Sequence, residues 1–494
     1  MNNWIYKIVF CVLLAGSLSG CTKFLDLPAR NERAVLALED IKANLAGYLY
    51  AQSTMANSAV VGLCPIFRYD MVKMFEAYSD NIDFNKALVS NYLVPNNTMT
   101  EKNYANLLLY NDFDTPGVIW KNYYETIGFL NALIDEMPNV TYEDQTEYDQ
   151  IMGEMLTHRA YYFFKLFQYF APYKKASEGI PVYLHTGENV MGVSMGRKTH
   201  AEVYQTILTD LNNALSLLQK SGSKDKFNLF FTSWRLNHIL AQVYWYKAGS
   251  PAGEASDWTN AEKYADAAVK GIDDYIPTTS EQINTTNKGS NGNYPAFYLY
   301  SSMYGGVSGI WASTWAYMGF NPSSIPAPSD FYNLFTPDDI RTSCYFSGVN
   351  TINDAWPDGN AYGSKNGRFF LFRPEEAYLI LAEARYHTKG DALGTLNKFK
   401  SFRNAGTFSG SGDALLQEIM NERRKEFFGD TDKRWLDLKR YGDVTITRKM
   451  TFFEKEYTIT VAPDDYRYAL PIPLDELQQN NAISQNEGWV QLEF

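Results

Sequence analysis

The sequence predicts a mainly α-helical protein, a degenerate tetratricopeptide-like helical-repeat scaffold that carries one long, irregular, aromatic-rich loop region. Apolar residues recur at helical spacing through most of the chain after residue 34. Short Gly- and Pro-containing breaks divide these stripes into helix–turn–helix pairs, but helical spacing disappears between residues 275 and 370. Tetratricopeptide arrays stack such pairs with a period of about 34 residues. The spacing here is irregular, so we expect a degenerate version of that scaffold.

The first 20 residues form an export signal. Lys7 supplies a positive charge, residues 8–15 form an unbroken apolar run, and small residues then lead to Cys21. This order is typical of a secretory signal peptide, and the apolar run is too short for a bilayer, which takes ~20 residues to span. Leu18-Ser19-Gly20-Cys21 resembles a bacterial lipobox. That resemblance implies a signal peptide over 1–20, lipidation of Cys21 and a lipid-anchored tether over 21–33; the alternative is an ordinary signal peptide cut elsewhere.

The clearest helix pair lies before residue 275. Apolar stripes run from Leu236 to Ala248 and from Ala261 to Ile272, and Gly249-Ser250-Pro251 separates them. The same pattern predicts three further pairs: 120–137 with 148–170, 201–218 with the helix around Trp234, and 374–387 with 391–402. In the last pair Pro374 suits a first helical turn, and Lys389-Gly390 suits a helix end.

A change of composition divides the mature chain into two parts. Residues 34–285 form an N-terminal helical-repeat part, and residues 286–494 form a C-terminal part with irregular loops and the final helices. We expect the two to pack as one unit. Between Gly289 and Ser329 there is no charged residue, and Tyr294 to Tyr332 contains 11 aromatic residues. Long irregular loops are usually functional or disordered, and this one is too aromatic for disorder.

Composition excludes some classes of partner. The chain has a net charge of −12 and no basic cluster, whereas nucleic-acid affinity comes largely from Lys and Arg that neutralise phosphates. We therefore expect no nucleic-acid partner. Cys64 and Cys344 are the two cysteines beyond the lipobox. They either form a disulfide in an oxidising compartment or remain as two buried thiols.

Three C-terminal strings occur in a distinctive order. The first is 373–384, the second is 421–430 with 434–440, and the third begins at Leu470-Pro-Ile-Pro473 and ends at Gly488-Trp489. In this order and spacing they resemble the SusD/RagB family of outer-membrane lipoproteins. Further strings agree upstream: 159–162, 180–182, 202–204 and 243–244, the last followed by Trp258, Ala261, Tyr264 and Ala265. The resemblance covers nearly all of the mature chain.

The family resemblance implies a SusD-like fold and a binding task without a chemical step. Family members sit on the outer face of the outer membrane and bind a nutrient, most often an oligosaccharide. They act as a lid for a SusC-like TonB-dependent transporter. We therefore expect a lipid-anchored protein that faces the cell exterior, binds a neutral oligosaccharide and needs no cofactor or metal. The segment after Cys21 contains only one acidic residue, Asp26, whereas surface-export signals are often more acidic.

The charged residues of these strings are expected to hold the fold. Arg373, Glu376 and Glu383 lie on or beside one helix, and we expect buried ion pairs from them to neighbouring helices. We expect similar pairs among Glu422, Arg423, Arg434 and Asp437. Buried pairs of this kind specify an arrangement more than they stabilise it. The Pro-Ile-Pro turn is expected to fold the C-terminal tail back onto the body.

The ligand site is predicted in the aromatic loops. An aromatic face attracts the C–H groups of a sugar ring, and amide, carboxylate and phenol groups then bind the hydroxyls. The aromatic stretch 294–332, which has no charged residue as far as Ser329, fits this description, and the family commonly uses this region opposite the loop after the first helices. The candidate ligand-binding residues are Tyr78, Asp80, Asn81, Tyr92, Tyr294, Tyr304, Trp311, Trp315 and Tyr317. The alternative for each aromatic residue is a place in the core.

Enzyme signatures are weak. Gly192-Val-Ser-Met-Gly196 matches the nucleophile-elbow pattern but lacks the apolar strand that this motif needs before it. The chain has only five histidines and no Cys/His cluster of the kind that binds zinc. We therefore expect a binding protein and no enzyme. The alternatives are a peptide-binding uptake lipoprotein and a tetratricopeptide-type adaptor that binds only protein.

Overall fold

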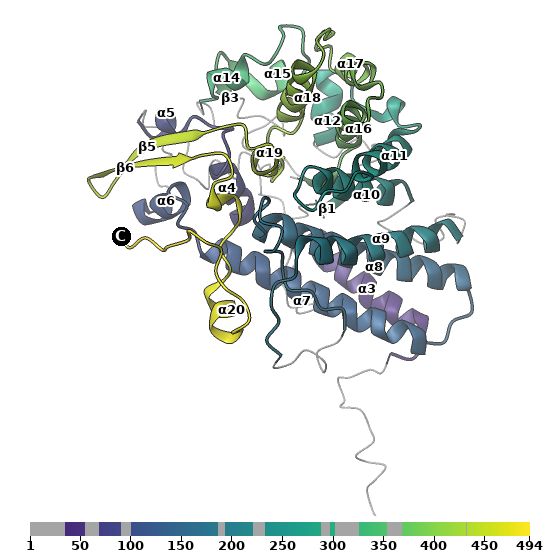
Figure 1. Cartoon of the computed structure of the whole chain (residues 1–494). Helices are drawn as coiled ribbons and strands as arrows, with labels where there is room; N and C mark the ends of the chain where they lie inside the picture. Colours follow the sequence, from purple (N-terminus) through teal and green to yellow (C-terminus); the bar gives the residue numbers. More distant parts are fainter. Residues whose placement is uncertain are drawn as a thin grey trace, which may run out of the picture.

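A computed structural model describes residues 35–54, 69–89, 100–185, 193–220, 233–287, 297–301, 326–352, 368–430 and 432–494. Most of these residues are helical (Figure 1). The helices of the N-terminal part are α3 (Leu38–Thr54), α4 (Tyr69–Ala77), α5 (Phe84–Val89), α6 (Glu101–Leu108), α7 (Asp114–Glu136), α8 (Gln145–Phe170), α9 (His200–Lys220), α10 (Ser233–Ala248), α11 (Asp257–Val269) and α12 (Ser280–Asn287). Those of the C-terminal part are α14 (Ser329–Tyr332), α15 (Thr342–Tyr345), α16 (Pro374–Thr388), α17 (Ala392–Phe402), α18 (Asp413–Glu426), α19 (Lys433–Tyr441) and α20 (Leu474–Gln479).

The strands are short and pair only in twos within the described residues. The antiparallel pairs are β1 (Phe297–Ser301) with β4 (Arg368–Phe372), β2 (Phe346–Gly348) with β3 (Thr351–Ile352), and β5 (Ile446–Phe452) with β6 (Lys455–Val461). Side chains of β5 alternate between buried and exposed, as in a strand with one face on the body. The sequence analysis did not predict this hairpin. Its turn residues, Phe453 and Glu454, both have positive φ angles but carry none of the usual Gly or Asn signals.

Successive helices pack in one continuous row. Helix α7 packs on α8, α8 on α9, α9 on α10, and α10 on α11. The row then continues from α11 to α16, which in turn packs on α17 and α18. The predicted helix pairs are confirmed, although α7 begins at Asp114, before the predicted start at Trp120. Helices from both predicted parts of the chain therefore share one array.

Local capping explains where several helices begin and end. At α9, the Thr199 hydroxyl accepts from the Glu202 amide (3.3 Å), and the Glu202 carboxylate accepts from the Thr199 amide (2.8 Å). This reciprocal pair is a capping box. Helix α16 has Pro374 in its first turn and ends at Lys389, which adopts a left-handed conformation with φ of 65°. The predicted start and stop of this helix are confirmed.

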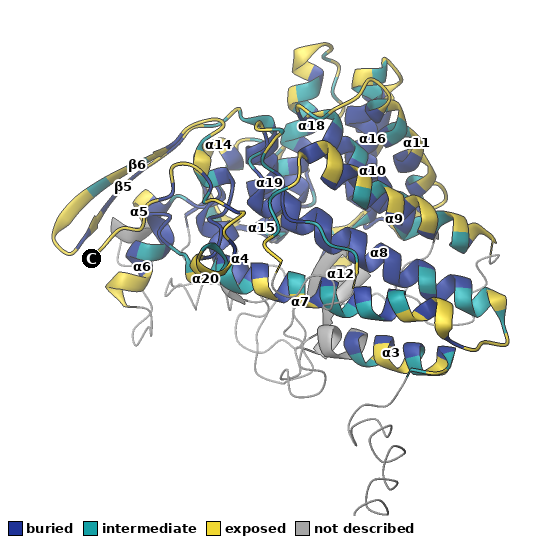
Figure 2. Cartoon of the chain, turned by 60° about the horizontal axis from the view of Figure 1, so that its bottom comes forward, coloured by how far each residue is buried: buried dark blue, intermediate teal, exposed yellow. Residues whose placement is uncertain are grey.

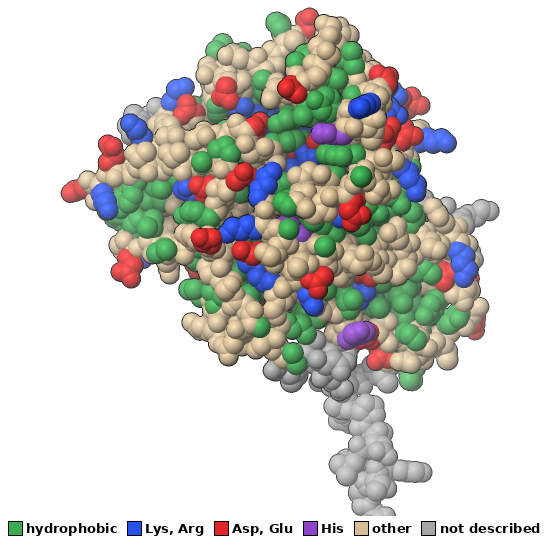
Figure 3. Space-filling view, viewed as in Figure 1, with side chains coloured by type: hydrophobic (Ala, Val, Ile, Leu, Met, Phe, Trp, Pro, Cys, Tyr) green, Lys and Arg blue, Asp and Glu red, His purple; other side chains and the backbone are tan. Residues whose placement is uncertain are grey.

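The core runs along the whole row of helices. Helix α8 is buried along most of its length, whereas α9 exposes one face to solvent (Figure 2). Much of the interior is aromatic, including the fully buried side chains of Tyr123, Tyr162 and Trp435. On the surface, acidic and basic side chains are interspersed over the face in Figure 3. The helical array thus buries its apolar stripes against one another and leaves charged outer faces.

The charged residues of the C-terminal strings form buried ion pairs, as predicted. Arg423 lies 3.0 Å from Asp437 and 3.6 Å from Glu376, and Arg440 lies 2.6 Å from Glu383. A larger cluster, here called the C-terminal charge network, contains Asp339, Arg341, Arg373, Glu375, Arg403, Glu422 and Glu426. One expectation was wrong in its partner: Arg434 forms its short ion pair with Asp80.

The C-terminal tail folds back onto the body, as the Pro-Ile-Pro turn predicted. The Asn486 amide donates to the carbonyl groups of Phe170 (2.9 Å) and Leu470 (2.7 Å). The Trp489 indole donates to the Ala469 carbonyl at 2.7 Å. The tail therefore covers the C-terminal end of α8. Cys344 is a buried residue of α15, while Cys64 lies outside the described residues.

Candidate functional site

The loop after α4 contains three of the predicted ligand-binding residues. One of its acidic residues, Asp80, accepts two hydrogen bonds from Arg434, at 2.6 and 2.7 Å. Arg424 lies 3.0 Å from the same carboxylate. Although burial opposes ionisation, the two guanidinium groups hold the pKa of Asp80 below its usual range. Asp80 therefore serves as the anchor of this loop on α18 and α19.

Tyr78 and Asn81 lie on either side of Asp80 and are buried. The Tyr78 ring stacks on Tyr110 with centroids 4.3 Å apart. The Asn81 side chain donates to the Glu76 carboxyl group at 3.1 Å. Burial raises the pKa of Glu76 to about 8, although the Asn81 hydrogen bond acts in the opposite direction. These interior positions give no support for direct ligand contact by Tyr78, Asp80 or Asn81.

The other predicted site residues lie outside the described residues: Tyr92, Tyr294, Tyr304, Trp311, Trp315 and Tyr317, together with the lipidation candidate Cys21. The described ends of the two predicted segments do meet. The Asp83 amide donates to the Pro326 carbonyl at 3.1 Å. This hydrogen bond joins the loop after α4 to Pro326, which belongs to the predicted aromatic stretch 294–332.

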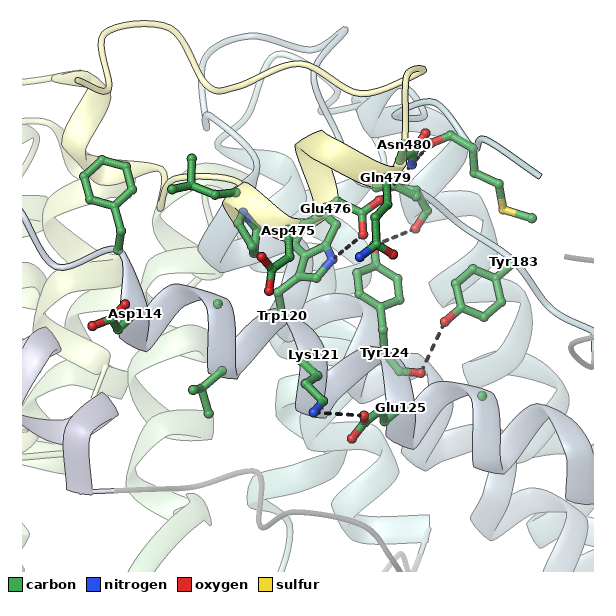
Figure 4. A pocket seen from close by; sticks show the side chains of 18 of the residues that line it. Asp114, Trp120, Lys121, Tyr124, Glu125, Tyr183, Asp475, Glu476, Gln479 and Asn480 are labelled. Carbon is green, nitrogen blue, oxygen red and sulfur yellow. Dashed lines mark hydrogen bonds and ion pairs between the residues drawn. The ribbon is translucent and has the colours of Figure 1, made fainter. Parts of the chain in front are cut away.

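A groove that the sequence analysis did not predict lies between α7 and α20 (Figure 4). Its volume is about 950 Å³, near the upper end of the range for small-molecule sites. The first four turns of α7 form its floor, and α20 and the chain segments around 181–185 and 193–195 form its sides. The lining residues that carry its chemistry are Asp114, Gly117, Trp120, Lys121, Tyr124, Glu125, Gly128, Tyr183, Asp475, Glu476, Gln479 and Asn480.

Three aromatic rings form one wall of the groove. Trp120 lies 4.8 Å from Tyr124, and Tyr124 stacks on Tyr183 with centroids 5.7 Å apart. Backbone carbonyls accept both phenol hydroxyls: Tyr124 donates to Pro181 at 2.9 Å, and Tyr183 donates to Tyr124 at 3.2 Å. Burial raises the pKa of both phenols, so they stay protonated at neutral pH. The wall is therefore neutral and fixed in position.

Polar groups of α20 form the opposite edge. The Glu476 carboxylate accepts from the Trp120 indole at 3.3 Å and from the Asn480 amide at 2.8 Å. The first bond joins α20 to α7, and the second orients the same carboxylate from the end of α20. By contrast, Asp114 and Asp475 are exposed. Among the described residues, no hydrogen bond or ion pair reaches either carboxylate. Both carboxylates therefore remain available at the groove.

The floor of the groove contains two glycines on one face of α7. Gly117, Lys121, Tyr124 and Gly128 follow at helical spacing, so they share that face. A Cβ atom at Gly128 would meet no atom within 4 Å, and one at Gly117 would meet only Pro473, at 4.0 Å. Glycine inside a helix costs ~1 kcal/mol relative to alanine. No packing contact in the described structure requires Gly128, but its absent side chain widens the groove.

The groove could be foreseen only in part. The spacing of Gly117 and Gly128 beside Tyr124 on one helical face is visible in the sequence. However, the opposite edge comes from α20, which follows in the chain by more than three hundred residues and meets α7 only in the folded protein. The Pro-Ile-Pro string predicted a turn there but no site.

The described ranges of the chain lack two features. Within those ranges, no helix has both the length and the apolar character needed to cross a bilayer. The same ranges contain no group of three or more His, Cys, Asp or Glu side chains arranged to hold a metal ion.

Two family models match the chain. One, described as starch-binding and associating with the outer membrane, matches residues 48–245. The other, described as the SusD family, matches residues 337–489. Among curated proteins, the starch-binding protein SusD of Bacteroides thetaiotaomicron is 31% identical over 119 residues. That match covers 24% of this chain and only 21% of SusD itself.

Solved structures show the same fold over nearly the whole chain. A SusD superfamily protein from Bacteroides vulgatus is 21% identical with a TM-score of 0.68, over 92% of this chain and 100% of that one. A SusD-like carbohydrate binding protein from the same species is 18% identical with a TM-score of 0.66, over 91% and 97%. A SusD superfamily protein from B. thetaiotaomicron is 20% identical with a TM-score of 0.65, over 91% and 100%.

Proposed function

The chain belongs to the SusD/RagB family, and from this premise we propose that it is a carbohydrate-binding protein of the outer membrane. It holds a neutral oligosaccharide, which the uncharged aromatic composition of its loops favours, and passes it to a transporter without any chemical step. The matching family description of starch binding and outer-membrane association supports the general task.

The proposed nutrient site is the aromatic stretch 294–332 together with the loop after α4. The observation that carries this proposal is the hydrogen bond between Asp83 and Pro326, because it joins the described ends of both segments. Uncharged aromatic surface suits the C–H faces of a neutral sugar. The buried Asp80 anchor supports the same arrangement, since it holds the first loop firmly on α18 and α19.

The proposed setting is the cell surface. Lipid on Cys21 would hold the protein to the outer membrane through the tether 21–33, and a SusC-like TonB-dependent transporter would receive the ligand. The protein then acts as a lid over the transporter. No catalytic group is assigned, because the task needs only binding and release.

Isothermal titration of the soluble body, starting after Cys21, tests this function. We expect heat on addition of a neutral oligosaccharide and at least tenfold weaker binding by a Trp311→Ala, Trp315→Ala double variant, because stacking surface is lost. Tyr275→Ala, which removes an exposed aromatic ring outside these loops, is the control and should bind normally. Binding of peptides, together with no binding heat for any sugar, would replace the proposal with peptide uptake.

A further inference from the structure

The groove between α7 and α20 stands apart from the proposed nutrient loops. Helix α20 and the first turns of α7 lie on the lower side of the molecule in Figure 1, whereas α5 and α14, which follow Asp83 and Pro326, lie at the top. The groove also differs in charge from the uncharged aromatic stretch. Asp114, Glu125, Asp475 and Glu476 line it, against Lys121 and His185.

We propose that this groove is a second saccharide-binding site, which takes a short sugar chain without acidic groups and binds amino sugars best. Its volume of about 950 Å³ is large enough for a short oligosaccharide by the usual size of small-molecule sites. The combination of an aromatic wall with a polar edge matches the two kinds of surface that a sugar presents, its C–H face and its hydroxyl rim.

The wall is already ordered before any ligand arrives. Tyr124 and Tyr183 stack on each other, and hydrogen bonds to backbone carbonyls fix both hydroxyls. A ligand therefore loses little affinity to the ordering of these rings. Gly128 leaves open space on the floor beside them, so a sugar ring can approach the α7 backbone closely.

The charges of the groove set its preference. Lys121 already lies 3.7 Å from Glu125, and the carboxylates of Asp114 and Asp475 add negative charge at the same groove. Carboxylates accept hydrogen bonds from hydroxyl groups and attract the ammonium group of an amino sugar. A uronic acid would instead bring a like charge to these groups. The groove therefore favours amino sugars over neutral sugars and excludes uronates.

The test compares three probes of similar length by isothermal titration: a glucosamine tetramer, its N-acetylated form and a galacturonate tetramer. Wild-type protein should bind the first most tightly and the third not at all. Gly128→Gln should weaken binding of both non-acidic probes at least tenfold, because its side chain fills the floor. Asp475→Asn should weaken the glucosamine tetramer about threefold to tenfold and change the N-acetylated form less.

Matched controls separate the groove from general effects. Ala201→Gln places the same side chain on an exposed part of α9, and Asp274→Asn removes one exposed carboxylate elsewhere. Both should bind like wild type, and the circular dichroism spectra of all variants should agree. Equal binding by wild type and Gly128→Gln, or preference for the galacturonate tetramer, would overturn the proposal.

The design also distinguishes this proposal from the proposed nutrient site. The Trp311→Ala, Trp315→Ala variant should retain groove binding. If only that variant loses saccharide binding, the nutrient site stands and the groove proposal fails. If Gly128→Gln loses binding while the tryptophan variant keeps it for every sugar, the groove stands and the nutrient loops fail.

Discussion

The C-terminal charge network and the groove between α7 and α20 use polar side chains in opposite ways. In the network, Arg341 is fully buried and lies 2.7 Å from Asp339, 2.5 Å from Glu422 and 3.0 Å from Glu426. In the groove, the acidic residues Asp114 and Asp475 are exposed. Charges that hold a fold are matched internally, whereas charges that bind a ligand must stay accessible.

The network gains its specificity from this matching. Burial works against ionisation of Glu426, but Arg403, Arg373 and Arg341 together hold its pKa at about 2. A single unmatched charge at such a depth would be costly, because desolvation is no longer offset by a partner. The network therefore permits one arrangement of α16 and α18, with the loop residues Asp339 and Arg403 between them.

The largest expected effect tests the Asp80 anchor of the loop after α4, which forms part of the proposed nutrient site. Asp80 and Asp330 both contact Arg424, but their side chains are 13% and 69% exposed. Asp80→Ala should lower the free energy of unfolding by about 2–4 kcal/mol, because it leaves Arg434 and Arg424 without their shared partner. Thermal denaturation measures the change.

Asp330→Ala is the matched control for Asp80→Ala, since it removes a partner of the same arginine. An exposed ion pair contributes at most about 1 kcal/mol, so its melting temperature should stay near that of wild type. Equal losses in the two variants would contradict the expected difference in stability between a buried and an exposed ion pair. Loss of sugar binding by Asp80→Ala without loss of stability would restore Asp80 as a ligand contact.

The helical array was largely predictable from the sequence, because its signal is local. The apolar stripe from Leu236 to Ala248 shows the helical period within a short stretch of sequence. The capping residues of α16 likewise mark where that helix begins and ends. Partners across the chain were harder. Arg434 was expected to pair between the last two helices, yet its partner is Asp80, and no local pattern encodes such a pairing.

The next effect concerns the buried Glu76 below the same loop. Its pKa is raised from an ordinary value of 4.5 to about 8, chiefly by burial. The native state therefore holds this proton more tightly than the unfolded chain. The contribution of protonated Glu76 to the free energy of unfolding is therefore fully present below pH 4.5 and is lost as the pH rises through 8.

Glu76→Gln cannot ionise and keeps a carbonyl oxygen for the Asn81 hydrogen bond. We expect the stability of the variant relative to wild type to rise by about 3 kcal/mol between pH 6 and pH 9, since wild type loses ~1.4 kcal/mol per pH unit until the pH passes the Glu76 pKa of about 8. The difference should be smaller at pH 6. Chemical denaturation of both proteins at the two pH values gives the comparison, and a difference that does not grow with pH would contradict it.

The sites were less predictable than the helices for a physical reason. A groove forms where two distant segments meet and leave space. Neither the sequence of α7 nor the Pro-Ile-Pro string predicts by itself that these segments meet. The β5–β6 hairpin was missed because Phe453 and Glu454 take positive φ angles without glycine. The strings that identified the family instead mark buried residues such as Glu426 and Arg423, which hold the fold.

The smallest expected effect compares two helical glycines, one at the groove and one in the core. A Cβ atom at Gly128 meets nothing within 4 Å, whereas one at Gly153 of α8 meets Leu218 at 3.3 Å. Gly128→Ala should raise the free energy of unfolding by about 0.5–1 kcal/mol through helix propensity alone. Gly153→Ala should gain less, because Leu218 must shift to admit the methyl group. A larger gain at Gly153 than at Gly128, measured by thermal denaturation, would show that the floor of the groove is more tightly packed than the core, and would remove the space on which ligand binding there depends.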